Sequence, residues 1–255
     1  MKKTILIAGC TALLLSAVGL AGCGGAGDTS SGGALISTYS IDVSSEKPVS
    51  SASSEAVTNT VNKSLEQGNV TVAYPRLVTD GDAAAAAKAN ELIAADAKQV
   101  LKNAAKNKSD SGAIDYTLLQ SEDEMSVVYT GTLIDKETGK PKTFVATTNI
   151  DRETGEREET GIAKNAAAVA DAMQQGSVTV LESDKQTKAS VTNALQEMDT
   201  GELTGLLKNC DFTEKNKTPE CFSYFLGEDG DQVVIYVPVK TNDYAIVCVN
   251  MDALT

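Results

Sequence analysis

The spacing of apolar and polar residues predicts a strand followed by a long helix at the start of the folded region. Apolar residues alternate with polar ones from Val70 to Tyr74, and Pro75 is expected to end this strand. Asp80-Gly81-Asp82 predicts a turn and a helix N-cap. From Ala83 to Lys106 the period changes to three or four residues, which predicts a helix whose apolar face comprises Ala89, Leu92, Ile93, Ala97, Val100, Leu101 and Ala104.

Three strands are predicted after this helix, because alternating apolar residues recur between short polar breaks. We place them at Ile114–Leu119, Met125–Asp135 and Thr143–Asp151. Short connections between consecutive strands favour pairing of chain neighbours, so these three form an antiparallel meander.

Two helical regions and three more strands follow in the C-terminal part. The helical regions are Ile162–Gln175 and Lys185–Lys208, the second broken near Thr200-Gly201. Glu228-Asp229-Gly230-Asp231 predicts a tight hairpin turn, because Asp-Gly tolerates the positive φ that such turns need. The last three predicted strands are Cys221–Leu226, Gln232–Val237 and Tyr244–Met251.

The order β-α-βββ-αα-βββ predicts an α+β fold, in which helices pack on one face of antiparallel sheet. Residues 68–255 have the length of one domain or of two small halves, 68–160 and 161–255.

The N-terminal residues have the pattern of a bacterial export signal rather than of a structural helix. A short positive start is followed by an apolar run, Thr4–Leu20, and then by Leu20-Ala21-Gly22-Cys23. This ending is similar to the lipobox of bacterial lipoproteins, in which the cysteine receives a diacylglycerol. We therefore predict a signal peptide over residues 1–22 and a lipid anchor, carrying acyl chains such as palmitate, at Cys23. An ordinary secretory signal is the alternative.

Residues 23–67 are rich in glycine and serine, which predicts a flexible tether between anchor and domain. A short edge strand near Ile36–Val43 is the one element we expect there. The predicted location is the outer side of the cell membrane, to which the protein is held by its lipid anchor.

The charge balance narrows the partners of the chain. Its 35 acidic and 22 basic residues give a formal net charge of −13, and loss of Lys2 and Lys3 with the signal would make it −15. Such a protein is repelled by nucleic acid and by anionic lipid headgroups. A basic extracellular protein would be attracted, although acidity can also serve solubility alone.

The chain contains no histidine, which excludes the commonest general base and the commonest zinc ligand. We therefore assign no catalytic residue, no cofactor and no metal site. An enzyme would have to work with carboxylates alone, as glycan hydrolases do.

Three cysteines follow Cys23 in the chain. Cys210 and Cys221 enclose a polar loop, and an exported location permits a disulfide between them. The alternative is three free thiols. Cys248 lies on a predicted strand, where it is expected to serve as a small buried residue.

A near-repeated heptapeptide, Ile134–Lys140 and Ile150–Glu156, follows two of the predicted strands. Each copy reads Ile-Asp-basic-Glu-Thr-Gly and then a charged residue, which is compatible with a cation loop or with a turn. The aspartate can accept bonds from nearby backbone N–H groups and the glycine can take a positive φ, so we predict strand-end turns.

Three stretches carry a resemblance to a known family. Residues 70–93 (VTVAYPRLVTDGDAAAAAKANELI), which include Asn90, and residues 144–156 (FVATTNIDRETGE) resemble the domain that precedes the catalytic part of PdaC-type peptidoglycan deacetylases. Residues 221–254 are similar to the C-terminal region of RsiV-type anti-sigma factors, whose extracellular part senses lysozyme. The resemblance implies this fold and an envelope setting; the deacetylase catalytic domain has no counterpart in the chain.

These features together predict a non-enzymatic cell-envelope lipoprotein with an extracytoplasmic ligand-binding domain. The expected ligand is peptidoglycan or a basic lysozyme-like protein. The alternatives are a carboxylate-only enzyme that acts on glycans and a structural or accessory subunit of an envelope complex.

Overall fold

The computed structural model describes residues 59–78, 82–107, 110–121, 123–181, 185–226, 232–239 and 243–254. The predicted signal peptide, the lipid attachment at Cys23 and most of the predicted tether lie outside these residues, as does the predicted hairpin turn at 228–231. Among the described residues no helix is both long and apolar enough to cross a bilayer.

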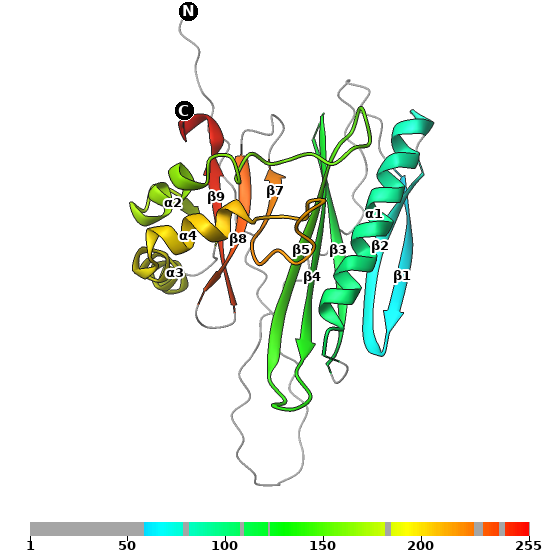
Figure 1. Ribbon diagram of the computed structural model, residues 1–255, viewed down its shortest axis with the longest axis horizontal. Helices are drawn as coiled ribbons and strands as arrows, with labels where there is room; N and C mark the ends of the chain where they lie inside the picture. Colours follow the sequence, from blue (N-terminus) through cyan, green and yellow to red (C-terminus); the bar gives the residue numbers. More distant parts are fainter. Residues whose placement is uncertain are drawn as a thin grey trace, which may run out of the picture. The chain divides into compact units, whose positions relative to one another are not determined.

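The chain has the predicted α+β class and contains two sheets (Figure 1). The first sheet has the order β1-β2-β3-β4-β5 and the second has the order β6-β9-β8-β7. The strands of the first sheet are β1 Asn59–Gln67, β2 Asn69–Val78, β3 Ser111–Gln120, β4 Glu124–Ile134 and β5 Pro141–Asp151. Those of the second are β6 Thr179–Val180, β7 Phe222–Leu226, β8 Gln232–Val239 and β9 Asp243–Asn250.

In the described part of the chain, four α-helices connect and cover these sheets. They are α1 Ala83–Ala104, α2 Ala166–Gln174, α3 Lys185–Glu197 and α4 Thr200–Lys208, and a 3₁₀ turn, η1 Met251–Leu254, follows β9. The predicted N-cap of α1 forms, because Asp82 Oδ1 accepts from the N–H groups of Ala84 and Ala85. A second cap, which was not predicted from the sequence, is formed by Asp199, whose Oδ1 accepts from the N–H groups of Gly201 and Glu202 at the start of α4. Asp199 therefore marks the predicted break between α3 and α4.

The first sheet is mixed rather than fully antiparallel. β3, β4 and β5 form the predicted antiparallel meander, whereas β2 and β3 run parallel and are joined through α1. The crossover through a helix allows this parallel pairing, since a tight turn joins only antiparallel strands.

The predicted order lacks two strands, β1 and the two-residue β6, and one predicted strand boundary is wrong. Residues 59–67, assigned to the tether, form β1, which pairs antiparallel with β2 through a turn at Gly68 (φ 63°). β2 also continues through Pro75 to Val78 instead of ending at the proline. Its pairing with β3 ends at Val72, so Pro75 has a strand partner on one side only, where a missing N–H is tolerated.

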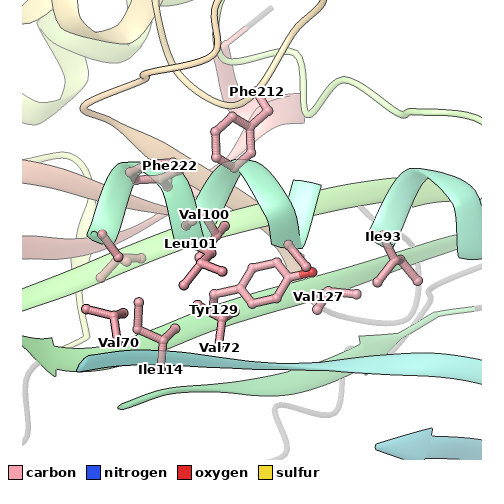
Figure 2. Close-up of a cluster of buried hydrophobic side chains, with 14 of the residues drawn as sticks. Val70, Val72, Ile93, Val100, Leu101, Ile114, Val127, Tyr129, Phe212 and Phe222 are labelled. Carbon is pink, nitrogen blue, oxygen red and sulfur yellow. The ribbon is translucent and has the colours of Figure 1, made fainter. Parts of the chain in front are cut away.

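The first hydrophobic core fills the space between α1 and the first sheet (Figure 2). The predicted helix face supplies Ile93, Ala97 and Val100, each fully buried, and β4 supplies Val127 and Tyr129. Asn90 fixes the helix on β2, because its side-chain amide donates to the Leu77 carbonyl and accepts from the Leu77 N–H.

A second core lies between the second sheet and its helices, with buried residues from α2, α4, β8 and β9. Phe212 and Phe222, from the C-terminal part of the chain, belong to the first core (Figure 2). The change of sheet falls between Asp151 and Thr179, the region in which we expected two halves to meet.

Candidate functional site

A run of buried hydrogen bonds joins β4 and β5 to β7, and we call it the polar seam. It comprises Ser126, Thr147, Asn149, Thr160, Asp211 and Ser223. Asn149 donates to the Ser223 carbonyl, while the Ser126 hydroxyl donates to Asn149 and accepts from the Phe225 N–H. β7 is the edge strand of its sheet, so these side chains satisfy backbone groups that would otherwise lack a partner.

Asp211 lies at the centre of the polar seam. It is the one described non-glycine residue with a positive φ, at 65°. Its carboxylate accepts from the backbone N–H and the hydroxyl of Ser223, and from the hydroxyls of Thr147 and Thr160. Burial raises the pKa of this carboxyl group to about 6, and the hydrogen bonds from Ser223, Thr147 and Thr160 oppose that rise.

A second polar cluster lies on the opposite face of β5, against α1. One guanidinium nitrogen of Arg157 lies 2.8 and 2.9 Å from the two carboxylate oxygens of Asp96, and Thr148 donates to the same carboxylate at 2.8 Å. Asp96 and Thr148 are buried, which makes the ion pair part of the core. Tyr129 extends toward this cluster, but its buried hydroxyl has no hydrogen-bond partner.

The two heptapeptides form matching turns, as predicted. Asp135 Oδ1 accepts from the Glu137 and Thr138 N–H groups, and Asp151 Oδ1 accepts from the Thr154 N–H. The glycines have φ 66° and 71°, and in each turn the glycine N–H donates to the aspartate carbonyl. The hydrogen bond from Thr138 is the largest of the effects that lower the pKa of Asp135.

No group of three or more acidic or cysteine side chains suited to a metal ion occurs in the described part of the chain. The aspartates of the heptapeptides are occupied by backbone donors. Their charges therefore serve the turns.

An open cavity of about 420 Å³ lies where α1, β5 and the second sheet approach one another. We call it the aromatic groove. Phe144 and Tyr244 are partly exposed on it, and Phe222 is buried beneath it. Its remaining lining residues are Asn103, Lys106, Lys142, Thr143, Val145, Thr218, Pro219, Glu220, Pro238 and Val239.

A row of tyrosines continues from the aromatic groove across the second sheet. Tyr244 contacts Tyr236 with ring centroids 6.1 Å apart, and Tyr236 contacts Tyr224 at the same separation. Burial raises the pKa of both Tyr224 and Tyr236, which keeps these phenols neutral over the ordinary pH range. The chain has only seven tyrosines and four phenylalanines and no tryptophan. Five of these eleven aromatic residues lie in the aromatic groove and the tyrosine row together.

The charge of the aromatic groove differs from that of the chain. Lys106 and Lys142 line it against one acid, Glu220, whereas acids outnumber bases over the whole sequence. The groove therefore joins apolar rings to a local positive charge, a combination that suits a ligand with both apolar faces and carboxylates.

A second cavity, of about 290 Å³, is lined by three carboxylate side chains. It is lined by Glu158, Glu159 and Asp211, together with Arg157, Lys208 and Lys215. Asp211 is held by its four hydrogen bonds in the polar seam. Burial, followed by the charges of Asp151 and Glu124, raises the pKa of Glu158.

Cys210 and Cys221 are buried beside each other as free thiols, with their sulfur atoms 2.7 Å apart. Cys248 is partly exposed on β9, so the prediction that it is a buried residue is wrong. The structure thus brings together the two cysteines predicted to pair.

No family model matches the chain, and no curated protein matches it. The resemblance to PdaC-type and RsiV-type domains therefore stays a prediction.

The sequence did not point to the polar seam or to the aromatic groove. One signal was present, since three polar residues, Thr147-Thr148-Asn149, separate the apolar residues 144–146 from Ile150. All three are buried, which shows that both faces of β5 are covered. The groove residues come from segments far apart in the chain, so no local pattern marks them.

Proposed function

We propose that this chain is a non-enzymatic, lipid-anchored protein of the bacterial cell envelope whose aromatic groove binds peptidoglycan. The observation that carries the proposal is the gathering of scarce aromatic side chains with two lysines at one groove. The export pattern and the lipobox-like ending at Cys23 support the proposed location.

The chemistry of peptidoglycan matches the two kinds of side chain in the groove. Its sugar rings have apolar C–H faces that pack on aromatic rings, for which Phe144 and Tyr244 are placed. Its stem peptides carry carboxylates, to which Lys106 and Lys142 can donate charge-assisted hydrogen bonds. Thr143 and Asn103 add neutral polar groups of the kind that fix ligand orientation.

Sedimentation of the full-length chain with purified peptidoglycan sacculi tests this proposal. We expect the wild-type protein to pellet with the sacculi, and the Phe144→Ala and Lys142→Glu variants to remain largely in solution. Lys98→Glu is the matched control, because Lys98 is an exposed α1 residue that does not line the groove. Equal pelleting of all four proteins would exclude the groove as the binding site.

The same assay addresses catalysis. Release of soluble fragments from the sacculi would contradict a non-enzymatic role and favour a carboxylate-only enzyme. The cavity with Glu158, Glu159 and Asp211 would then be the place to substitute first.

A basic lysozyme-like protein is the second candidate ligand, favoured by the formal net charge of −13. Binding driven by charge weakens as salt screens it, with a Debye length of about 10 Å at 0.1 M. If the wild type and Phe144→Ala capture a basic muramidase equally well at low salt, this ligand would be favoured over peptidoglycan bound in the aromatic groove.

A further inference from the structure

The two buried thiols of Cys210 and Cys221 are placed for a covalent bond. Their sulfur atoms lie 2.7 Å apart, little more than the approximately 2.05 Å of an S–S bond. The backbone of the two segments is also joined beside the cysteines, because the Asp211 N–H donates to the Cys221 carbonyl at 2.9 Å. The two chain segments are therefore already in register where the bond would form.

The residues between these cysteines form the 210–221 loop, which lines both cavities. Phe212, Thr213 and Lys215 face the 290 Å³ cavity, whereas Thr218 and Pro219 line the aromatic groove. The loop contains no helix or strand. A covalent bond at its neck would thus stabilise part of the walls of both cavities.

Hydrogen bonds already fasten the loop at three points. The Asn216 side-chain amide donates to the Asn209 carbonyl at 2.8 Å, and the Asn216 backbone N–H donates to the Thr213 hydroxyl at 2.9 Å. Asn103 of α1 donates to the Lys217 carbonyl at 3.0 Å. Each of these bonds holds one position within the loop, whereas a bridge between Cys210 and Cys221 would close its base.

We infer that Cys210 and Cys221 form an intrachain disulfide that closes the 210–221 loop when the chain meets a disulfide oxidant. The reaction is thiol–disulfide exchange with an oxidised dithiol protein or glutathione disulfide. The two cysteine thiols lose two protons and two electrons, and their sulfurs form one S–S bond. The S–S bond of the oxidant breaks, and its sulfurs leave as two thiols.

Burial dictates when this exchange occurs. Cys221 is fully buried and Cys210 is 4% exposed, so an oxidant cannot reach them in the folded chain. Burial also raises the pKa of the Cys210 thiol, which keeps the reactive thiolate scarce. The bond therefore forms while the chain folds, and once formed it resists reductants until the chain unfolds.

Mass-spectrometric peptide mapping of the full-length chain tests the inference. In one arm, cells that produce the chain are lysed directly into acid, and the precipitated protein is dissolved in denaturant with an alkylating agent and digested without reduction. In the other arm, purified protein is reduced in denaturant and refolded with glutathione disulfide. We expect a linked peptide pair containing Cys210 and Cys221, with Cys248 alkylated, in both arms.

The two arms separate the pairing from the proposed location. Alkylated Cys210 and Cys221 after refolding with glutathione disulfide, or a bond of either to Cys248, overturns the inference. A Cys210–Cys221 bond after refolding, together with alkylated Cys210 and Cys221 from cells, supports the pairing but contradicts export. The inference rests on the proposed export only for its cellular setting. Peptidoglycan binding is read in a separate assay, so its failure is distinguishable.

Melting temperatures give an independent readout. Unfolding in reductant should lower the melting temperature of the oxidised chain by about 5–10 °C, the effect expected for a bond across a loop of about ten residues. Cys248→Ala should retain this sensitivity, and Cys221→Ala should abolish it. A reductant effect that persists in Cys221→Ala contradicts the assignment.

Discussion

The two heptapeptide glycines offer a matched pair for testing the packing of the turns. Gly139 and Gly155 have φ of 66° and 71° and make the same hydrogen bond to the aspartate four residues earlier. Their surroundings differ, since a Cβ on Gly139 would meet nothing within 4 Å. A Cβ on Gly155 would lie 2.0 Å from the carbonyl oxygen of Ala85, in the first turn of α1.

This contrast sets the expected magnitudes. Gly139→Ala places a side chain in the left-handed region in open space, which costs about 1–2 kcal/mol. Gly155→Ala has the same backbone cost, and in addition the turn and α1 must separate, which costs about 1–3 kcal/mol as overpacking. The helix cannot yield alone, because the Asn90 side-chain amide is hydrogen-bonded to both the N–H and the carbonyl of Leu77 in β2.

Thermal unfolding of the two full-length variants, followed by circular dichroism, measures the difference. At about 2–4 °C for each kcal/mol, Gly155→Ala should melt about 2–12 °C below Gly139→Ala. Equal melting temperatures for the two variants would refute the close contact between the second turn and α1.

Three further predictions concern buried polar groups. The pKa of Asp211 is raised to about 6 in the folded state, so its protonation stabilises the fold below about pH 4, and this contribution is lost as the pH rises through about 6. The melting temperature of Asp211→Asn, measured across this pH range, should lack this part of the pH dependence that the wild type shows. Asn149→Ala should destabilise the chain by about 1–3 kcal/mol in denaturant unfolding, because the buried Ser223 carbonyl loses its hydrogen-bond donor. An unchanged denaturant concentration at the unfolding midpoint would show that the polar seam is not formed. Tyr129→Phe should leave the free energy of unfolding unchanged or raise it slightly, since the hydroxyl that it removes is buried without a hydrogen-bond partner. A loss of more than about 1 kcal/mol in the free energy of unfolding would reveal a hydrogen bond of this hydroxyl.

Much of the fold could be predicted from local pattern, because most elements have one buried and one exposed face. The face of α1 is an example, since Ile93, Ala97 and Val100 are all fully buried as their spacing indicates. The two heptapeptide turns also follow from local chemistry, because an aspartate and a glycine suffice to form them.

β1 escaped prediction for a physical reason. Eight of its nine residues, Asn59–Gln67, are exposed, so backbone pairing with β2 holds the strand and no apolar face marks it. The end of β2 was predicted wrongly at Pro75, because a proline disrupts a strand only where its missing N–H is needed by a neighbouring strand. Whether it is needed is a property of the sheet and not of the local sequence.

The candidate sites could not be predicted because they depend on contacts between distant segments. Asp211 meets Thr147 and Ser223 across 64 and 12 positions of the chain. The aromatic groove likewise joins Phe144 to Tyr244, which belong to different sheets. The cysteine pair was predicted from the sequence, because its two members lie only eleven positions apart and enclose one polar loop.

Calorimetric titration of the full-length chain with a soluble disaccharide-peptide fragment of peptidoglycan decides whether the aromatic groove binds peptidoglycan. We expect saturable binding by the wild type, and an affinity at least about tenfold weaker, or about 1.4 kcal/mol, for Phe144→Ala and for Lys142→Glu. Lys98→Glu should bind as the wild type does. Absence of binding by the folded wild-type chain, or equal affinity for all four proteins, would show that the groove is not a peptidoglycan site.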